Sequence, residues 1–151
     1  MRSLAVRPRL LVTMVAGMGV AATESRAQET TSQAAVPAEL VGTDWRLAEL
    51  DGRPPDPDLP PVTLSFGPLR AEGSGGCNWY AAWLGDGRDG GLAVSNLAAT
   101  RRDCRHPRIM ERETRYLAAL EEFSGYRLTK GALALTFGTT DEETRLVFTP
   151  D

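Results

Sequence analysis

The chain has few of the residues that metal sites and nucleophilic active sites need. It contains two cysteines and one histidine. A structural zinc ion normally takes four ligands, and Cys77, Cys104 and His106 fall short of that number. A cysteine hydrolase would need an activated thiolate beside a base, and the short spacing of Cys104 and His106 does not establish that geometry. We therefore expect no catalytic residue, no metal and no cofactor.

The N-terminal apolar stretch is too short to cross a membrane. Residues 10–22 are uncharged and largely apolar, but a spanning helix requires about 20 such residues. Arginines precede this stretch, and small residues lie at positions 25 and 27. This pattern predicts a cleavable signal peptide at residues 1–27 and a periplasmic or secreted protein. No cysteine lies near the cleavage point, so we expect neither a lipobox anchor nor an integral membrane segment after cleavage.

Positive charge is also scarce once the signal peptide is removed. The net charge of −3 would become −6, because the segment carries four arginines and one glutamate. An acidic domain is a poor candidate for sequence-independent nucleic-acid binding, so we expect no nucleic-acid partner. The simpler explanation of the negative net charge is that it keeps the protein soluble.

The two cysteines are expected to form one disulfide. Oxidising compartments allow thiols to pair and stay paired, which fits an exported chain. The alternative is two buried free thiols. Gly73, Gly75 and Gly76 precede Cys77 and allow a sharp backbone bend that would let it face Cys104.

Alternating apolar residues and turn signals predict a single domain at residues 40–151, after a flexible segment at 28–39. Five prolines make residues 53–61 a loop, and glycine-rich or polar turns are expected at 85–91 and 138–143. Short strands are expected near residues 45–50, 62–66, 69–73, 78–84, 92–97, 126–130, 133–137 and 145–148.

One helix is expected to begin at Pro107. Its apolar stripe runs through Ile109, Tyr116, Leu117 and Leu120. We expect an α+β fold: a small curved or barrel-like, mostly antiparallel sheet of about seven strands, with one main α-helix packed on it.

Glu113 falls within the apolar stripe of this helix. A buried carboxylate needs a partner, and we expect Arg101 or a backbone amide to supply it.

Six arginines concentrate positive charge at the start of the helix. Guanidinium groups bind carboxylates and phosphates in a forked geometry, so these residues form a possible surface for an anion or a protein partner. The alternative is a solvated helix face that pairs with Glu111, Glu121 and Asp103. Arg108, Arg112 and Arg115 are expected opposite the apolar stripe. The six residues are Arg101, Arg102, Arg105, Arg108, Arg112 and Arg115.

Trp79 and Trp83 form a possible aromatic surface. Side chains alternate along a strand, so both tryptophans share one face with Ala81, and Tyr80 lies on the other. Core packing of at least one face is the default, whereas exposure of both tryptophans would favour a binding surface.

Several segments, in this order, resemble the META domain (HslJ-like) family. They are LVGTDWRL at 40–47, TLSF at 63–66, GGCNWY at 75–80, ATRRDC at 99–104, the helix at 113–120 and LAL at 133–135. The resemblance covers about residues 40–150. It implies a barrel-like domain of envelope or secreted proteins, associated with stress, motility or antibiotic tolerance, and it carries no enzymatic activity. The chain departs from the family pattern at Arg102, where relatives often have an apolar residue.

These features together favour an exported, non-enzymatic protein with an envelope stress-response or accessory binding role. We expect a monomer whose partner is an envelope protein or a small anionic ligand. A small inhibitor or protein-interaction module acting on another envelope protein is the alternative, and a cysteine-dependent hydrolase is a third.

Overall fold

The computed structural model describes residues 36–87, 91–137 and 143–151. The signal peptide expected at 1–27 and parts of the loops expected at 85–91 and 138–143 lie outside these residues. The elements are β1 (Asp44–Leu50), β2 (Thr63–Phe66), β3 (Arg70–Ser74), β4 (Trp79–Asp86), β5 (Leu92–Ala99), α1 (Pro107–Glu122), β6 (Gly125–Thr129), β7 (Ala132–Phe137) and β8 (Glu143–Pro150).

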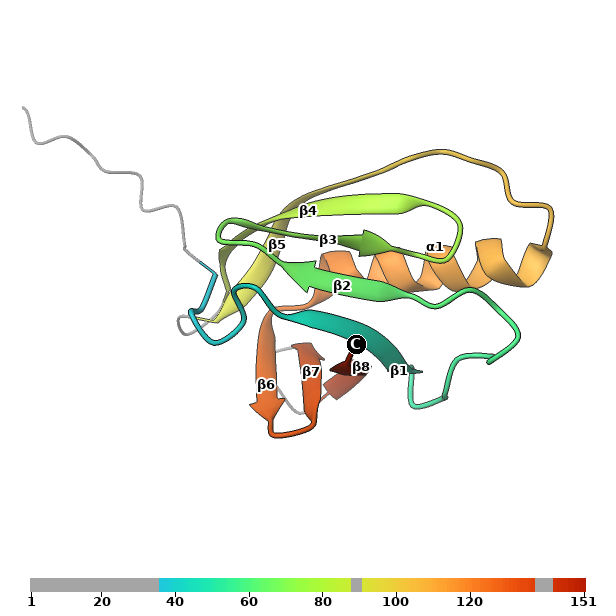
Figure 1. Ribbon diagram of the computed structural model, residues 1–151. Coiled ribbons are helices and arrows are strands. Elements are labelled where there is room, and N and C mark those ends of the chain that lie inside the picture. Colours follow the sequence, from blue (N-terminus) through green and yellow to red (C-terminus); the bar gives the residue numbers. More distant parts are fainter. Residues whose placement is uncertain (1–35, 88–90, 138–142) are drawn as a thin grey trace, which may run out of the picture. The chain divides into compact units, whose positions relative to one another are not determined.

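The described strands form one antiparallel sheet in the order β5-β4-β3-β2-β1-β8-β7-β6. The helix α1 connects β5 to β6, the two edge strands (Figure 1). Cα atoms of β5 and β6 approach within 8 Å of one another, although the two strands are not hydrogen-bonded neighbours in the sheet. The sheet therefore curls into a half-barrel. The α+β architecture expected from the sequence is confirmed, with eight strands where about seven were expected.

Alternation along the strands places apolar side chains on the inner face of the sheet. In β1, Trp45 and Leu47 are buried, and a register shift before Glu49 brings Leu50 to the same face. Leu133 and Leu135 of β7 fill the same core and are fully buried. The helix closes this core from the concave side, which explains its apolar stripe.

Two tyrosines join the helix to the sheet. The Tyr80 hydroxyl donates to the Thr63 carbonyl across 2.8 Å, and it lies 2.6 Å from the Tyr116 hydroxyl. Because Tyr80 uses its single proton on Thr63, Tyr116 donates to Tyr80. Gly73 makes room for this contact, since a Cβ there would lie 2.0 Å from the Thr63 carbonyl oxygen. Burial raises the pKa of both phenols.

Residues 36–39 pack on the domain, earlier in the chain than expected. Val36 is buried in the core, and Glu39 accepts a hydrogen bond from the Tyr126 hydroxyl across 2.6 Å. Residues 36–39, assigned to the flexible segment from sequence, therefore pack on the domain.

The helix differs from its sequence prediction at one position. Arg112 was expected opposite the apolar stripe, but it is only 8% exposed. It lies one turn before Tyr116, so it faces the molecule where two segments cover the helix. These are the loop at 53–61 and the glycine bend between β3 and β4, residues 75–78. Tertiary packing on this face therefore extends further round the helix than its apolar residues indicate.

Candidate functional site

The glycine bend between β3 and β4 docks on the Glu113 carboxylate. Its Oε2 accepts the backbone N–H of Cys77 at 2.9 Å and that of Asn78 at 2.6 Å. Its Oε1 accepts from the side-chain amide of Asn78 at 2.6 Å. Glu113 is 4% exposed, so these donors replace water. Backbone amides, one of the two partners expected from sequence, satisfy the carboxylate, and Arg101 is not among its hydrogen-bond partners.

Asn78 also holds the segment that precedes the helix. Its side-chain carbonyl oxygen accepts from the Thr100 hydroxyl at 2.8 Å and from the Arg102 backbone N–H at 2.7 Å. One buried side chain thus connects the glycine bend, α1 and residues 100–102. Sequence reasoning assigned Asn78 no role, although it directly follows the cysteine of the GGCN motif.

A disulfide joins Cys77 to Cys104, with their Cα atoms 6.0 Å apart. It links the same two segments that Asn78 connects. Within the described residues no cysteine is free, so Cys104 has no thiolate with which to attack a substrate.

The glycines of the bend allow its close approach to α1. A Cβ on Gly75 would lie 2.6 Å from Cγ of Glu113. Gly76 has a φ of 111°, a conformation that side chains other than glycine rarely adopt. A Cβ there would lie 2.4 Å from Nη2 of Arg112. The glycine pattern is thus explained by contact with the helix as well as by the disulfide.

The six arginines singled out from sequence divide into two groups. Arg101, Arg102 and Arg105 lie in the segment before α1, where Arg102 donates to the Cys77 carbonyl across 2.7 Å. The other three lie on α1 and line a pocket against residues 53–59; they are Arg108, Arg112 and Arg115.

The ion pairs of the helix arginines differ from those expected. Arg108 pairs with Asp56 of the proline-rich loop, and Arg115 pairs with Asp51 across 2.7 Å. Glu111, Glu121 and Asp103, the acidic residues considered from sequence, form no ion pair among the described residues. Acidic residues of the loop after β1 take their place, because that loop folds over the helix.

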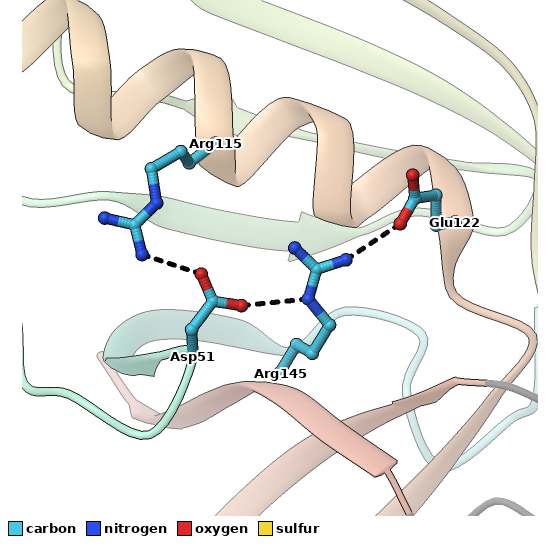
Figure 2. A network of polar contacts seen from close by, with 4 residues as sticks. All are labelled: Asp51, Arg115, Glu122 and Arg145. Atoms are coloured by element: carbon cyan, nitrogen blue, oxygen red, sulfur yellow. Dashed lines mark hydrogen bonds and ion pairs between the residues drawn. The ribbon is translucent and has the colours of Figure 1, made fainter.

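Asp51 is the centre of a polar network that links three elements (Figure 2). It receives Arg115 of α1 on one oxygen and Arg145 of β8 on the other, at 2.7 and 2.8 Å. Arg145 also pairs with Glu122 at 2.8 Å. Hydrogen bonds from Arg145 and then from Arg115 lower the pKa of Asp51. No sequence pattern indicates this network, because Asp51 lies 64 positions from Arg115 and 94 from Arg145.

Arg112 is the exception among the helix arginines. Its Nη2 donates to the Pro60 carbonyl, but its Nε and Nη1 have no hydrogen-bond partner among the described residues. It forms no ion pair there either. Burial lowers the pKa of Arg112, and the nearby charges of Asp56 and Glu113 oppose this shift.

The pocket beside Arg112 has a volume of about 230 Å³. Its walls combine charged and apolar side chains from the end of β1, the proline-rich loop and α1. They are Leu50, Arg53, Pro54, Pro55, Asp56, Leu59, Arg108, Glu111, Arg112 and Arg115.

Trp79 and Trp83 lie exposed on the outer face of the sheet, at 62% and 46% exposure. Trp79 borders an open groove of about 660 Å³, and Trp83 borders another of about 470 Å³. Ser65 and Glu72 line both grooves, so the two adjoin. Tyr80 is buried on the opposite face, as the alternation predicts.

The part of the chain that the structure describes contains no group of three or more metal-ligating side chains. Nor does any helix in that part have the length and apolar character needed to cross a membrane.

Comparison with known proteins agrees with this architecture. An NMR structure of a protein is 27% identical with a TM-score of 0.57, and covers 76% of this chain and 93% of its own. An NMR structure of a protein from Burkholderia xenovorans is 26% identical with a TM-score of 0.56, and covers 75% of this chain and 84% of its own. No curated protein matches. The family model described as META domain matches residues 38–151, and the chain therefore belongs to the META domain family.

Proposed function

We propose that this protein is an exported accessory protein of the bacterial envelope that acts by binding and not by catalysis, with a role in the stress response. The observation that carries the proposal is the Cys77–Cys104 disulfide. Such bonds form and persist in oxidising compartments outside the cytosol. The signal-like pattern of residues 1–27 is consistent with the same destination.

The disulfide also weighs against the cysteine hydrolase considered from sequence. That mechanism needs a free thiolate at Cys104, and its sulfur is bonded to Cys77. The neighbouring backbone and side-chain groups serve the fold: Glu113 and Asn78 hold the bend, and Arg102 caps the Cys77 carbonyl. The disulfide and these contacts form a rigid frame on which exposed binding residues can be presented.

The experiment is expression of the full chain with a C-terminal tag, followed by cell fractionation and mass spectrometry. We expect periplasmic or secreted material that lacks residues 1–27 and resists alkylation until a reductant is added. Recovery of the full chain in the cytosol with two alkylatable cysteines would overturn the proposal. Cytosolic expression without the N-terminal segment supplies the reduced reference protein.

A second candidate is an interaction module that acts on another envelope protein. The exposed Trp79 and Trp83 favour it, because tryptophan is enriched at the energetic centres of protein interfaces. Capture from an envelope extract should then retain one partner with the wild type and lose it with Trp79→Ser/Trp83→Ser. Leu128→Ser, which changes an exposed apolar residue of β6, is the matched control. Equal capture by all three proteins would exclude this role for the tryptophans.

A further inference from the structure

We propose that the pocket between α1 and the proline-rich loop binds a small organic oxyanion, a carboxylate or phosphate with a short apolar part, and that Arg112 is its anchor. The inference rests on the proposed binding function and names the ligand class for one site. It concerns the pocket lined by Arg53, Arg108, Arg112 and Arg115, and excludes the arginines before the helix.

Arg112 lacks the partners that a buried cation needs. A cation that is only 8% exposed needs an opposite charge or a full set of hydrogen bonds. Among the described residues, Arg112 has one hydrogen bond, to the Pro60 carbonyl, and no ion pair. Its Nε and Nη1 remain without acceptors. The charges of Asp56 and Glu113 act on Arg112 from nearby, but neither carboxylate accepts a hydrogen bond from Nε or Nη1. An oxyanion supplies the acceptor that these two atoms lack.

The pocket carries an excess of positive charge, which favours an anionic ligand. Four guanidinium groups line it against two carboxylates, Asp56 and Glu111. Asp56 pairs with Arg108, and Arg115 is engaged by Asp51 outside the pocket lining. Arg53 has no ion pair among the described residues. Positive charge thus exceeds negative charge at the pocket, although the chain as a whole is acidic.

The shape of the pocket limits the ligand. Its volume of about 230 Å³ is below the roughly 300–1,000 Å³ of drug-sized sites, so the ligand is small. Leu50, Pro54, Pro55 and Leu59 provide an apolar wall beside the guanidinium groups. Guanidinium forks match the paired oxygens of a carboxylate or phosphate. The combination selects an oxyanion that carries a short hydrocarbon group.

Access to Arg112 requires the loop to move. Nε and Nη1 are covered in the free protein, where residues 51–61 and the glycine bend both pack against Arg112. Every residue of this loop is exposed or half-buried, so little apolar packing holds it down. Two ion pairs attach it to the helix, Asp51 with Arg115 and Asp56 with Arg108. The third polar attachment is the hydrogen bond from Arg112 to Pro60. An entering oxyanion replaces the Pro60 carbonyl as the acceptor for Nη2, and its second oxygen accepts from Nε or Nη1.

Three probes test the pocket in NMR titrations of the oxidised, exported protein: inorganic phosphate, acetate and 4-methylpentanoate. We expect saturable shifts in residues 50–59 and 108–115. Tighter binding of 4-methylpentanoate than acetate identifies a carboxylate with an apolar part, and tighter binding of phosphate identifies a phosphate ligand. Absence of saturation with all three in the millimolar range would overturn the inference.

Arg112→Met tests the anchor, since methionine keeps much of the length and removes the charge. We expect affinity to fall at least about tenfold, as for loss of a hydrogen bond to a charged group. The unfolding temperature should be unchanged or higher, because a buried unpaired cation is removed. Arg105→Gln, an exposed residue outside the pocket, is the control and should leave affinity unchanged. Equal affinity in Arg112→Met would overturn the inference.

Asp56→Asn gives a second, independent readout. It removes the carboxylate that competes with the ligand for Arg108, so affinity should rise several-fold. Unchanged or weaker binding in this variant would count against the pocket even if Arg112→Met failed to fold. A protein that is exported and oxidised but binds no probe would overturn the pocket alone, whereas a reduced cytosolic protein would overturn the proposed function alone.

Discussion

The backbone N–H of Asn78 lies 2.6 Å from Oε2 of Glu113, across 35 positions of the chain. The N–H of Cys77 shares this oxygen, and the Asn78 side chain takes the other. One carboxylate on α1 thereby fixes the bend that carries half of the disulfide. We therefore expect the stability of the domain to depend on this carboxylate.

Replacing Glu113 with alanine should lower the free energy of unfolding by at least about 3 kcal/mol, because three buried donors lose their acceptor at about 1–3 kcal/mol each. Urea unfolding of the oxidised protein measures this change. Glu121→Ala, an exposed position on the same helix, should cost less than about 0.5 kcal/mol. Similar small losses for both variants would show that the carboxylate contributes little to the bend.

Opening the disulfide by the Cys77→Ala/Cys104→Ala double change should destabilise the fold by about 3.6 kcal/mol, from the entropy of a closed loop of about 28 residues. Thermal unfolding of the double variant and of the wild type, with and without reductant, provides the measurement. Reductant should destabilise the wild type and leave the double variant unchanged. An equal effect on both would mean that the bond does not stabilise the domain.

Gly75→Ala should cost about 1–3 kcal/mol, because the added methyl group would lie 2.6 Å from Cγ of Glu113. Gly131→Ala is the matched control, since nothing lies within 4 Å of a Cβ at that turn. Chemical denaturation measures the free energy of unfolding of the two variants. The difference between them separates the effect of close packing at residue 75 from the effect of alanine on backbone entropy. If Gly75→Ala were as stable as Gly131→Ala, the bend would not require its tight approach to the helix.

The Asp51 network should make stability depend on acid. Arg145 and Arg115 lower the pKa of Asp51 in the folded state, so the ionised form favours folding. This stabilisation is fully present above the ordinary aspartate pKa of about 3.9 and is lost as pH falls through the lower folded value. The measurement is unfolding as a function of pH in wild type and Asp51→Asn. Their stability difference should shrink below pH of about 4, and a constant difference would contradict the assignment.

The three tyrosines should not ionise near their ordinary pKa in the folded protein. Burial raises the pKa of Tyr80 and Tyr116, and burial followed by the Glu39 hydrogen bond raises the pKa of Tyr126 to about 12. The neutral phenols therefore stabilise the fold below pH of about 10, and this stabilisation declines as pH rises above it. Ultraviolet titration should show phenolate absorbance near pH of about 10 only in denatured protein. A native transition at that pH would argue against the buried tyrosine pair.

Local sequence patterns were sufficient to predict the strands and the helix of this fold. Alternation places Leu64 and Phe66 on one face of β2, and Pro107 with the stripe through Tyr116 and Leu120 delimits α1. These features follow from the periods of strands and helices, which involve only neighbouring residues. The same alternation separated exposed Trp79 from buried Tyr80.

Contacts between segments that are distant in the sequence were decided only by the tertiary structure. The loop after β1 folds over α1, so Asp51 meets Arg115 across 64 positions and Arg112 meets Pro60 across 52. No helical period could show that Arg112 is covered, because the cover comes from another part of the chain. The sequence thus determined the strands, the helix and a family resemblance, through short-range periodicity and motif order. The folding of the loop after β1 over α1 decided that Arg108 and Arg115 are paired, and it left Arg112 buried without an ion pair among the described residues.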